Sequence, residues 1–212
     1  DIPEPKKTEL IPYVLSSLSD NKNEYDIGAD IRYGISSNAV LNGTINPDFG
    51  QVEADPSVLN LSAYETFYDE KRPFFSEGAN FFQHRLQLFH SRRIGNAPGY
   101  FSPDSGEIEN EPGNTTILGA FKLLGTTKSG FNYGVINANT KEELGTIINA
   151  DGQKEDFIVE PRANYAVGRI EKSIINKFSR IGIMGTDVRR ENAEAASVAG
   201  LDWKIGLINN RL

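Results

Sequence analysis

The sequence contains no cysteine among its 212 residues, and only one Met and one Trp. The absence of cysteine excludes disulfides, thiolate metal sites and cysteine nucleophiles. No apolar run approaches the roughly 20 residues that a membrane-spanning helix needs. The phosphate-binding patterns G-x-x-x-x-G-K-[ST] and G-x-G-x-x-G are also missing. The formal net charge of −7 argues against a nucleic-acid binder, which needs a basic face to neutralise phosphates.

The first residues, DIPEPKKTEL, contain neither an initiator Met nor the apolar centre of a signal peptide. We therefore expect residues 1–8 to be a linker and the chain to be a mature or excised fragment. Residues 9–212 are long enough to form a single domain with a sizeable core.

Two segments alternate between apolar and polar residues with a period of two, the pattern of a β-strand with different faces. In Tyr25–Ser36 one face carries Tyr, Ile and Ala and the other Asp, Arg, Gly and Ser, and Val198–Ile208 repeats this pattern around Trp203. A transmembrane β-strand alternates in this way, and so does a solvated strand of a soluble sandwich. Both alternatives remain open from these segments alone.

Six further segments have strand character, and the connections predicted between them become alternately short and long after the first. Transmembrane barrels have this alternation because their tight turns lie on one side of the membrane and their long loops on the other. We therefore predict an all-β fold, an antiparallel up-and-down meander of about eight strands that forms part of a transmembrane β-barrel, and of a larger barrel cut short. The other predicted strands are Glu9–Leu18, Val40–Asn46, Thr116–Gly125, Phe131–Asn139, Ala163–Glu171 and Ser179–Asp187, with a long polar connection over Thr140–Arg162 and a charged loop near 188–197.

Residues 46–114 form the longest of these connections, and we predict that they fold into the lumen or over its extracellular mouth. Within it, Ser62 and Glu65 have the S-x-x-E spacing of a capping box, which predicts a short helix over Asn60–Tyr68. Such a helix is too short to be stable alone, so its aromatic neighbours must be buried against something else.

Acids, bases and aromatics are dense within this connection and supply the candidate binding residues. The carboxylates could bind a hard cation such as Ca²⁺, but their spacing is not that of an EF-hand loop. Ion pairs between arginine and carboxylate that fix the loop in place are the simpler hypothesis. The candidates are Asp48, Glu53, Asp55, Glu65, Glu70, Lys71, Arg72, Phe74, Phe75, Arg92 and Arg93.

The two histidines, His84 and His90, lie six residues apart, a spacing that on a strand places both on one face. There is no G-x-S-x-G motif and nothing else marks a nucleophile. We therefore predict no catalytic residues, no metal and no cofactor.

One part of the sequence resembles a family of uncharacterised Gram-negative outer-membrane proteins. This part is the segment NPDFGQVEADPSVLNLSAYETFYDEKRPFFSEGANFF, followed further on by LFHSRRIG. The proteins of this family carry an N-terminal carbohydrate-binding family 9-like domain followed by a long β-barrel known only as a domain of unknown function. The resemblance implies an outer-membrane location, a binding domain before Asp1 and further strands after Leu212. It brings no catalytic residues.

The expected function is therefore that of an outer-membrane β-barrel protein with a loop-plugged lumen, engaged in transport or in handling a glycan or another small nutrient. Its expected partner is the lipid bilayer of the outer membrane, and nucleic acid is not expected. Two alternatives stay open: a soluble β-rich carbohydrate-binding module, and a glycan hydrolase that uses carboxylates of residues 48–70.

Overall fold

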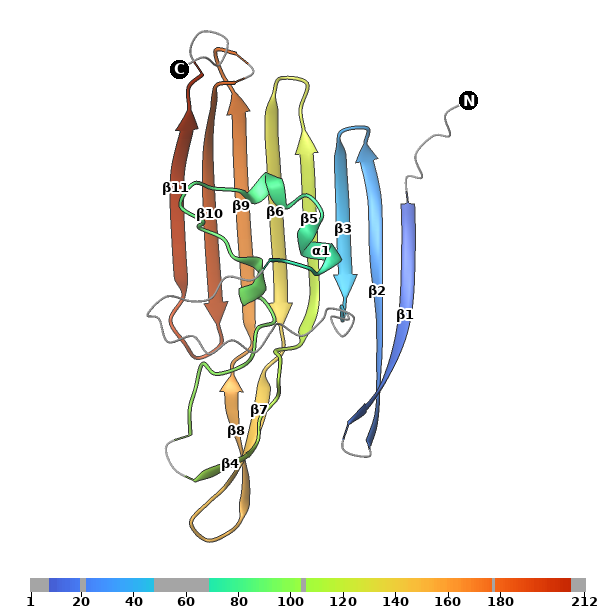
Figure 1. The fold of residues 1–212 in the computed structure, drawn as a ribbon, viewed down its shortest axis with the longest axis vertical. Coiled ribbons are helices and arrows are strands. Elements are labelled where there is room, and N and C mark those ends of the chain that lie inside the picture. The colour runs from blue at the N-terminus through green and yellow to red at the C-terminus, as the bar shows by residue number, and fades with distance from the viewer. Residues whose placement is uncertain (1–7, 20–21, 48–68, 104–105, 177, 207–212) are drawn as a thin grey trace.

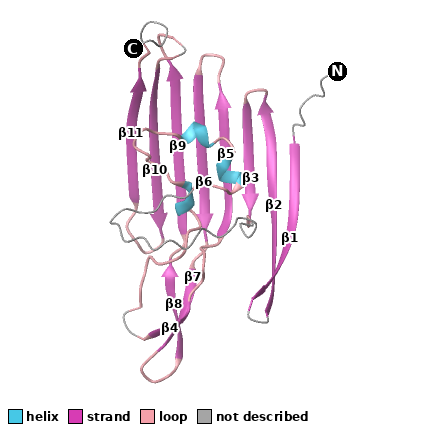
Figure 2. Cartoon of the chain, in the orientation of Figure 1, coloured by secondary structure: helices cyan, strands magenta, loops and turns pink. Residues whose placement is uncertain are grey.

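In the computed structural model, residues 8–19, 22–47, 69–103, 106–176 and 178–206 are described. They form an all-β structure with few helical turns (Figures 1 and 2). No helix within these ranges is both long enough and apolar enough to cross a membrane.

The main sheet has eight strands, in the order β1-β2-β3-β5-β6-β9-β10-β11. Every neighbouring pair is antiparallel, so this sheet is a meander, as the alternating segments predicted. Its strands are β1 (Thr8–Ser19), β2 (Lys22–Ser36), β3 (Ala39–Ile45), β5 (Ile117–Thr126), β6 (Phe131–Thr140), β9 (Ala163–Ser173), β10 (Arg180–Arg190) and β11 (Ala196–Lys204). Among the described strands, β1 and β11 stand at the two edges (Figure 1).

A second sheet of three strands projects from one end of the main sheet, in the order β4-β7-β8 (Figure 1). It consists of β4 (Glu107–Asn110), β7 (Glu143–Ile148) and β8 (Lys154–Glu160). The predicted long connection over Thr140–Arg162 does join β6 to β9, but most of it forms the β7–β8 hairpin, which was not predicted. The prediction of a long last connection is wrong, because β10 ends at Arg190 and β11 begins at Ala196, so the loop between them consists of residues 191–195 only.

We call residues 69–101 the covering segment. Most of it lies across one face of the main sheet (Figure 1), and its end reaches the small sheet, where the N–H of Phe101 donates to the carbonyl oxygen of Val159 in β8 at 3.0 Å. They contain one short helix and two 3-10 turns: α1 (Pro73–Ser76), η1 (Ala79–Phe82) and η2 (Ser91–Arg93). The short helix predicted over Asn60–Tyr68 lies outside the described residues. His84 and His90 lie in the covering segment and not on a strand, so the strand spacing considered for them does not apply.

The hydrophobic core lies between the covering segment and the sheet. Phe75, Phe82 and Ile94 of the segment pack against buried strand residues. On the sheet side the core consists of Ile117, Leu124, Ile136, Ala138, Ala163, Tyr165, Val167 and Met184. We call this side of the sheet the covered face and the opposite side the open face.

Candidate functional site

A glycine allows the covering segment to approach the centre of the sheet closely. A Cβ atom built on Gly134 of β6 would lie 2.8 Å from the ring of Phe82. The ring therefore occupies space that any larger residue at position 134 would fill. Phe82 is 6% exposed and contacts Phe89 edge to face, with 6.0 Å between the ring centroids.

Arg72 and Glu70 form an ion pair that closes the covering segment on itself. Arg72 donates from Nε to one carboxylate oxygen of Glu70 at 2.8 Å and from Nη2 to the other at 2.7 Å. Its guanidinium also donates to the carbonyl oxygens of Ile94 at 2.6 Å and Ser91 at 2.8 Å. The side chains of the pair are only 8% and 13% exposed. This bidentate pair therefore ties the beginning of the segment to the turn at η2.

The environment of Glu70 favours its ionised form. Burial by itself would raise the pKa of this carboxyl, but the hydrogen bonds and positive charge of Arg72 and the hydroxyl of Ser91 hold the pKa below its ordinary value. Ser91 donates its hydroxyl to Glu70 at 2.6 Å, and the backbone N–H of Arg72 donates at 3.0 Å. Glu70 is therefore an acceptor of several hydrogen bonds within the segment.

Lys122 anchors the short helix α1 to the middle of the sheet. Its side chain points from β5 onto the covered face and is fully buried. The ammonium donates to the carbonyl oxygens of Phe74 and Glu77. The Glu77 carboxylate in turn accepts from Asn42 at 3.4 Å and pairs with Arg32 at 2.6 Å. One turn of the segment is thus bound to β2, β3 and β5.

A second charged cluster lies where the covering segment meets β9 and β11. Arg169 pairs with Asp202 at 2.8 Å and with Glu171 at 3.1 Å. His84 Nδ1 accepts the N–H of Leu86 at 3.1 Å, which leaves Nε2 facing Asp202 at 4.0 Å. Among the residues that the structure describes, no hydrogen-bond partner is found for the buried atoms His84 Nε2, Asp202 Oδ1 and Arg169 Nη1. This is a densely polar contact within an otherwise apolar interface.

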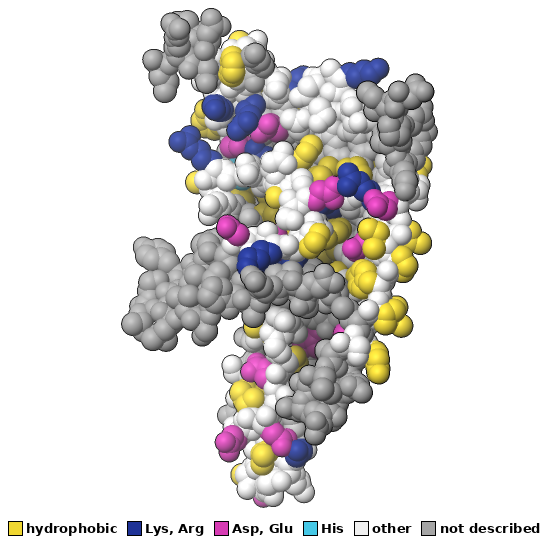
Figure 3. All heavy atoms as spheres, turned by 45° about the vertical axis from the view of Figure 1, so that its right-hand side comes forward, with side chains coloured by type: hydrophobic (Ala, Val, Ile, Leu, Met, Phe, Trp, Pro, Cys, Tyr) yellow, Lys and Arg dark blue, Asp and Glu magenta, His cyan; other side chains and the backbone are white. Residues whose placement is uncertain are grey.

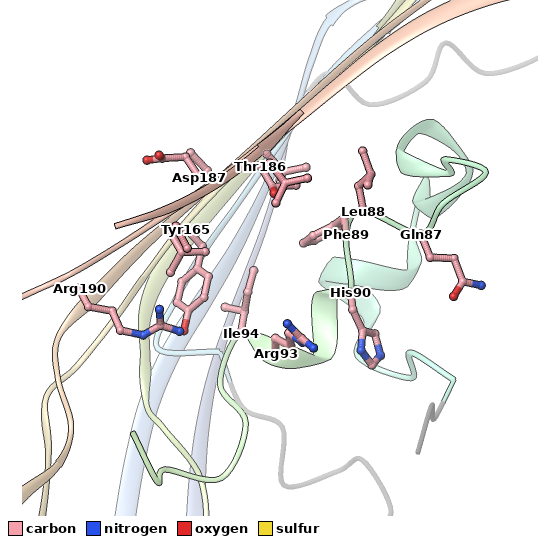
Figure 4. Close-up of a pocket in the computed structure, with 15 residues that line it drawn as sticks. Gln87, Leu88, Phe89, His90, Arg93, Ile94, Tyr165, Thr186, Asp187 and Arg190 are labelled. Atoms are coloured by element: carbon pink, nitrogen blue, oxygen red, sulfur yellow. The ribbon is translucent and has the colours of Figure 1, made fainter. Parts of the chain in front are cut away.

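A cavity of about 310 Å³ lies between the covering segment and strands β9, β10 and β11. Its apolar wall includes Leu88, Phe89, Ile94, Val167, Val188 and Val198, and its polar groups include Gln87, His90, Arg93, Tyr165, Thr186 and Arg190. Figure 4 shows the Arg190 guanidinium beside the Tyr165 ring, while the carboxylate of Asp187 points away from both. Mixed walls and this volume are typical of the smaller sites for organic ligands.

The structure places the predicted site residues in two groups. Asp48, Glu53, Asp55 and Glu65 lie outside the described residues. All the others belong to the covering segment: Glu70, Lys71, Arg72, Phe74, Phe75, Arg92 and Arg93. Arg92 donates to the carbonyl oxygen of Asp69 at 3.0 Å.

Other polar residues of the interface were not among the candidates. Lys122, Arg169, Asp202 and Arg190 come from strands, whereas the predicted site residues all lie within residues 46–114. The detectable signal was a charged residue on the polar side of an alternating strand, as in Val198–Ile208.

Both oxygens of Glu70 are bonded to Arg72, so this carboxylate is not presented as a free acid or base. Within the described ranges, no group of three or more His, Cys, Asp or Glu residues could hold a metal ion. The geometry supports a folded segment fixed on a sheet beside a ligand-sized cavity.

Comparison with known proteins gave a single result that concerns the whole chain. A family model described as a domain of unknown function matches residues 4–212. No curated protein matches the chain. No solved structure matches it.

Proposed function

The chain belongs to the family described as Domain of unknown function (DUF5916), and we propose that it is part of a transmembrane β-barrel of the Gram-negative outer membrane. In this proposal residues 9–212 form one barrel domain or barrel fragment, and residues 46–114 are a long insertion that lies in the lumen or on its extracellular side. The protein takes part in transport or in handling a glycan or another small nutrient, and this part of it performs no catalysis.

The observation that carries the proposal is the apolar open face of the main sheet. The strand register puts an exposed apolar side chain from every strand of the main sheet on this face: Leu10, Ile31, Ile45, Phe121, Val135, Ile170, Ile183 and Leu201. Figure 3, in which the side of β1 and β2 comes forward, shows hydrophobic side chains gathered along this edge of the sheet. An apolar surface that extends over a whole sheet indicates contact with a membrane or another apolar partner.

The apolar surface of the open face has a polar limit. Toward the end where β4, β7 and β8 project, the side chains become polar, and Asn164 exchanges hydrogen bonds with Asn137 at 3.1 Å and donates to Asn139 at 2.9 Å. Asp187 of β10 accepts from Ser197 of β11 at 2.5 Å on the same face. A lipid-facing band must end in this way where the strands leave the hydrocarbon region.

Aromatic residues lie near the other end of the open face. Phe131 of β6 and Trp203 of β11 lie in one row across the sheet, because Phe131 pairs with Lys172, Lys172 with Ile181 and Ile181 with Trp203. The side chain of Trp203 is 62% exposed. On β9, Lys172 and Asn164 are eight residues apart, about 26 Å along a strand. This length is close to the height of the apolar band of outer-membrane barrels, which is about 25 Å and is bordered by aromatic girdles.

The covered face carries the hydrophobic core together with buried charged residues, and these buried charges support the role of the covering segment as a filling of the lumen. Lys122, Arg169 and Arg72 are at most 6% exposed and satisfy their charges through carboxylates and carbonyl oxygens. A barrel interior is polar, and several known barrels are plugged by loops. Charges on the covered face and apolar side chains on the open face are therefore what this function requires.

The test is insertion of the protein into detergent micelles or lipid vesicles, followed by a gel run with and without heating. We expect heated and unheated samples of the protein to migrate differently on the gel. We also expect the protein to fold only in the presence of detergent or lipid. Ile31→Arg places a charge on the open face and should destabilise the inserted state by about 2–4 kcal/mol near the midplane. Asp30→Arg, on the covered face of the same strand, is the matched control and should have little effect.

A monomer that stays folded without detergent, or equal tolerance of arginine at positions 30 and 31, would refute the barrel. Those results would favour a β-rich carbohydrate-binding module instead. Turnover of a glycan that is lost on replacing Glu53, Asp55 or Glu65 would favour the hydrolase.

A further inference from the structure

A row of short side chains forms the floor of the cavity between the covering segment and strands β9 to β11. Val167, Thr186 and Val198 lie in one row across these strands, because Thr186 pairs with both of the others. The rows on either side of this one carry the longer side chains of Met184 and Tyr165. The row of short side chains therefore leaves a hollow in the covered face, and all three of its members line the cavity of about 310 Å³.

The roof of the cavity, residues 87–90 of the covering segment, is held above this floor at both ends. At one end a turn is closed by the N–H of Gln87, which donates to the carbonyl oxygen of His84 at 2.9 Å. At the other end Arg72 donates to the carbonyl oxygen of Ser91 at 2.8 Å. Because both ends of the roof are fixed by hydrogen bonds, the cavity is preformed, as most sites for small molecules are.

Apolar side chains line the cavity on both sides. They are Leu88, Phe89 and Ile94 from the covering segment and Val167, Val188 and Val198 from the three strands. Burial of apolar surface against such side chains is the main favourable contribution to binding. A hydroxyl-rich ligand would instead leave many of its groups without a hydrogen-bond partner against this wall. The wall therefore favours an apolar ligand over a sugar.

The charged groups beside the cavity are already paired or in contact with water. Arg190 pairs with Glu160 at 3.8 Å, and its guanidinium donates a hydrogen bond to the hydroxyl of Tyr165. The carboxylate of Asp187 points away from the cavity to the open face, where it accepts two hydrogen bonds (Figure 4). Arg93 is exposed, so water screens its charge. A charged ligand would therefore lose its hydration without gaining a partner of opposite charge.

We propose that this cavity binds a neutral apolar compound of the size of a substituted benzene ring. Apolar cavities of about 150 Å³ in proteins bind benzene, so a volume of about 310 Å³ leaves room for a ring that carries substituents. The inference rests on the proposed function, because the cavity lies on the face that would line the lumen. It names the class of small nutrient that is handled there.

The experiment is a titration of the folded protein in uncharged detergent micelles with fluorobenzene, followed by fluorine NMR. Micelles without protein also take up fluorobenzene, but this partition does not saturate, so that sample gives the background. We expect the protein to add a saturable signal of one molecule per chain. Toluene should displace the bound fluorobenzene. Benzoate, which has the same ring with a charge, and glucose should not displace it at the same concentration.

Strand β11 offers a matched pair of variants. Val198→Phe adds a ring at the floor of the cavity and should weaken fluorobenzene binding by about tenfold or more, because the new ring occupies volume that the ligand needs. Val198 is 50% exposed, so this change does not overpack the core. Leu201→Phe adds a ring on the open face, where Leu201 is 57% exposed, and should change binding less than about twofold. Val188→Phe on β10 fills the cavity from a second side and should also weaken binding.

Heat-dependent migration of each sample on a gel shows separately whether the barrel has formed. If the wild-type barrel forms and fluorobenzene gives no saturable signal, the ligand assignment is wrong and the proposed function stands. Displacement by benzoate or glucose as strong as that by toluene would also overturn the assignment. So would equal loss of binding in Val198→Phe and Leu201→Phe, or unchanged binding in both Val198→Phe and Val188→Phe. If the wild-type protein forms no barrel in micelles, the proposed function itself fails.

Discussion

Replacing Arg72 by Met should release the covering segment while the sheet stays folded. The side chain of Arg72 makes bidentate hydrogen bonds to Glu70 and reaches the carbonyl oxygens of Ser91 and Ile94. Methionine keeps much of the packing against the Phe75 ring, above which the guanidinium carbon lies at 4.3 Å. The change therefore removes mainly the polar contacts.

The size of the effect follows from the burial of the pair. Removing one partner of a buried ion pair costs about 3–5 kcal/mol, because the remaining charge keeps its desolvation cost without its partner. With side-chain exposures of 8% and 13% for Arg72 and Glu70, little of this is screened by water. A cost of about 3 kcal/mol raises the population of the opened segment about 100-fold.

Limited trypsin digestion of the inserted protein measures this population, because Arg92 and Arg93 lie in η2 at the end that Arg72 holds. Cleavage there should accelerate about 100-fold in Arg72→Met. Arg32→Met breaks the pair between Arg32 and Glu77, which is 53% and 45% exposed, and should cost less than about 1 kcal/mol. Equal cleavage rates in the two variants, or amide exchange in β5 and β6 accelerated as much as cleavage, would refute this reasoning.

Two further predictions concern acid and one glycine. Because Arg72 and Ser91 lower the pKa of Glu70 in the folded protein, its stabilising effect is present above the ordinary value of 4.5 and is lost as pH falls through the lowered pKa. The protection of the backbone amides of residues 70–94 against hydrogen exchange, corrected for the intrinsic exchange rate at each pH, should therefore fall in acid. Glu70→Gln should reduce this pH dependence, and an unchanged pH profile in the variant would contradict the prediction. Gly28→Ala should destabilise the folded protein by about 1–3 kcal/mol, because the new Cβ would lie 2.4 Å from the carbonyl oxygen of Asn46 and 2.4 Å from the ring of Tyr13 in β1. Gly168→Ala is the control, because there is open space around that position. Equal melting temperatures for the two variants would contradict the prediction.

The two faces of the main sheet explain why a segment rich in charge and aromatics can be structural. The open face leaves apolar side chains uncovered, whereas the covered face buries lysine and arginine beneath residues 69–101. Each buried cation is satisfied by carbonyl oxygens or carboxylates. The segment therefore supplies hydrogen-bond partners that the strands cannot supply to one another.

The sequence by itself determined the strands of the main sheet. Alternation over Tyr25–Ser36 is a local property, since successive side chains of a strand must point to opposite faces, and it defined both the strand and its two faces. The antiparallel pairs β1–β2, β2–β3, β5–β6 and β9–β10 followed from tight turns, because adjacent strands joined by a few residues pair with each other. The pairs β3–β5 and β6–β9 are instead joined by long connections.

Only the tertiary structure decided the small sheet and the interface. β4 pairs with β7 across more than thirty intervening residues, and no local pattern specifies such a partner. The covering segment has no single periodicity, so its contacts with Lys122, Asp202 and Arg190 depend on how the chain folds back over the sheet. Periodicity reports the local geometry of a strand, whereas contacts between distant segments depend on packing and charge pairing that form only when the chain is folded.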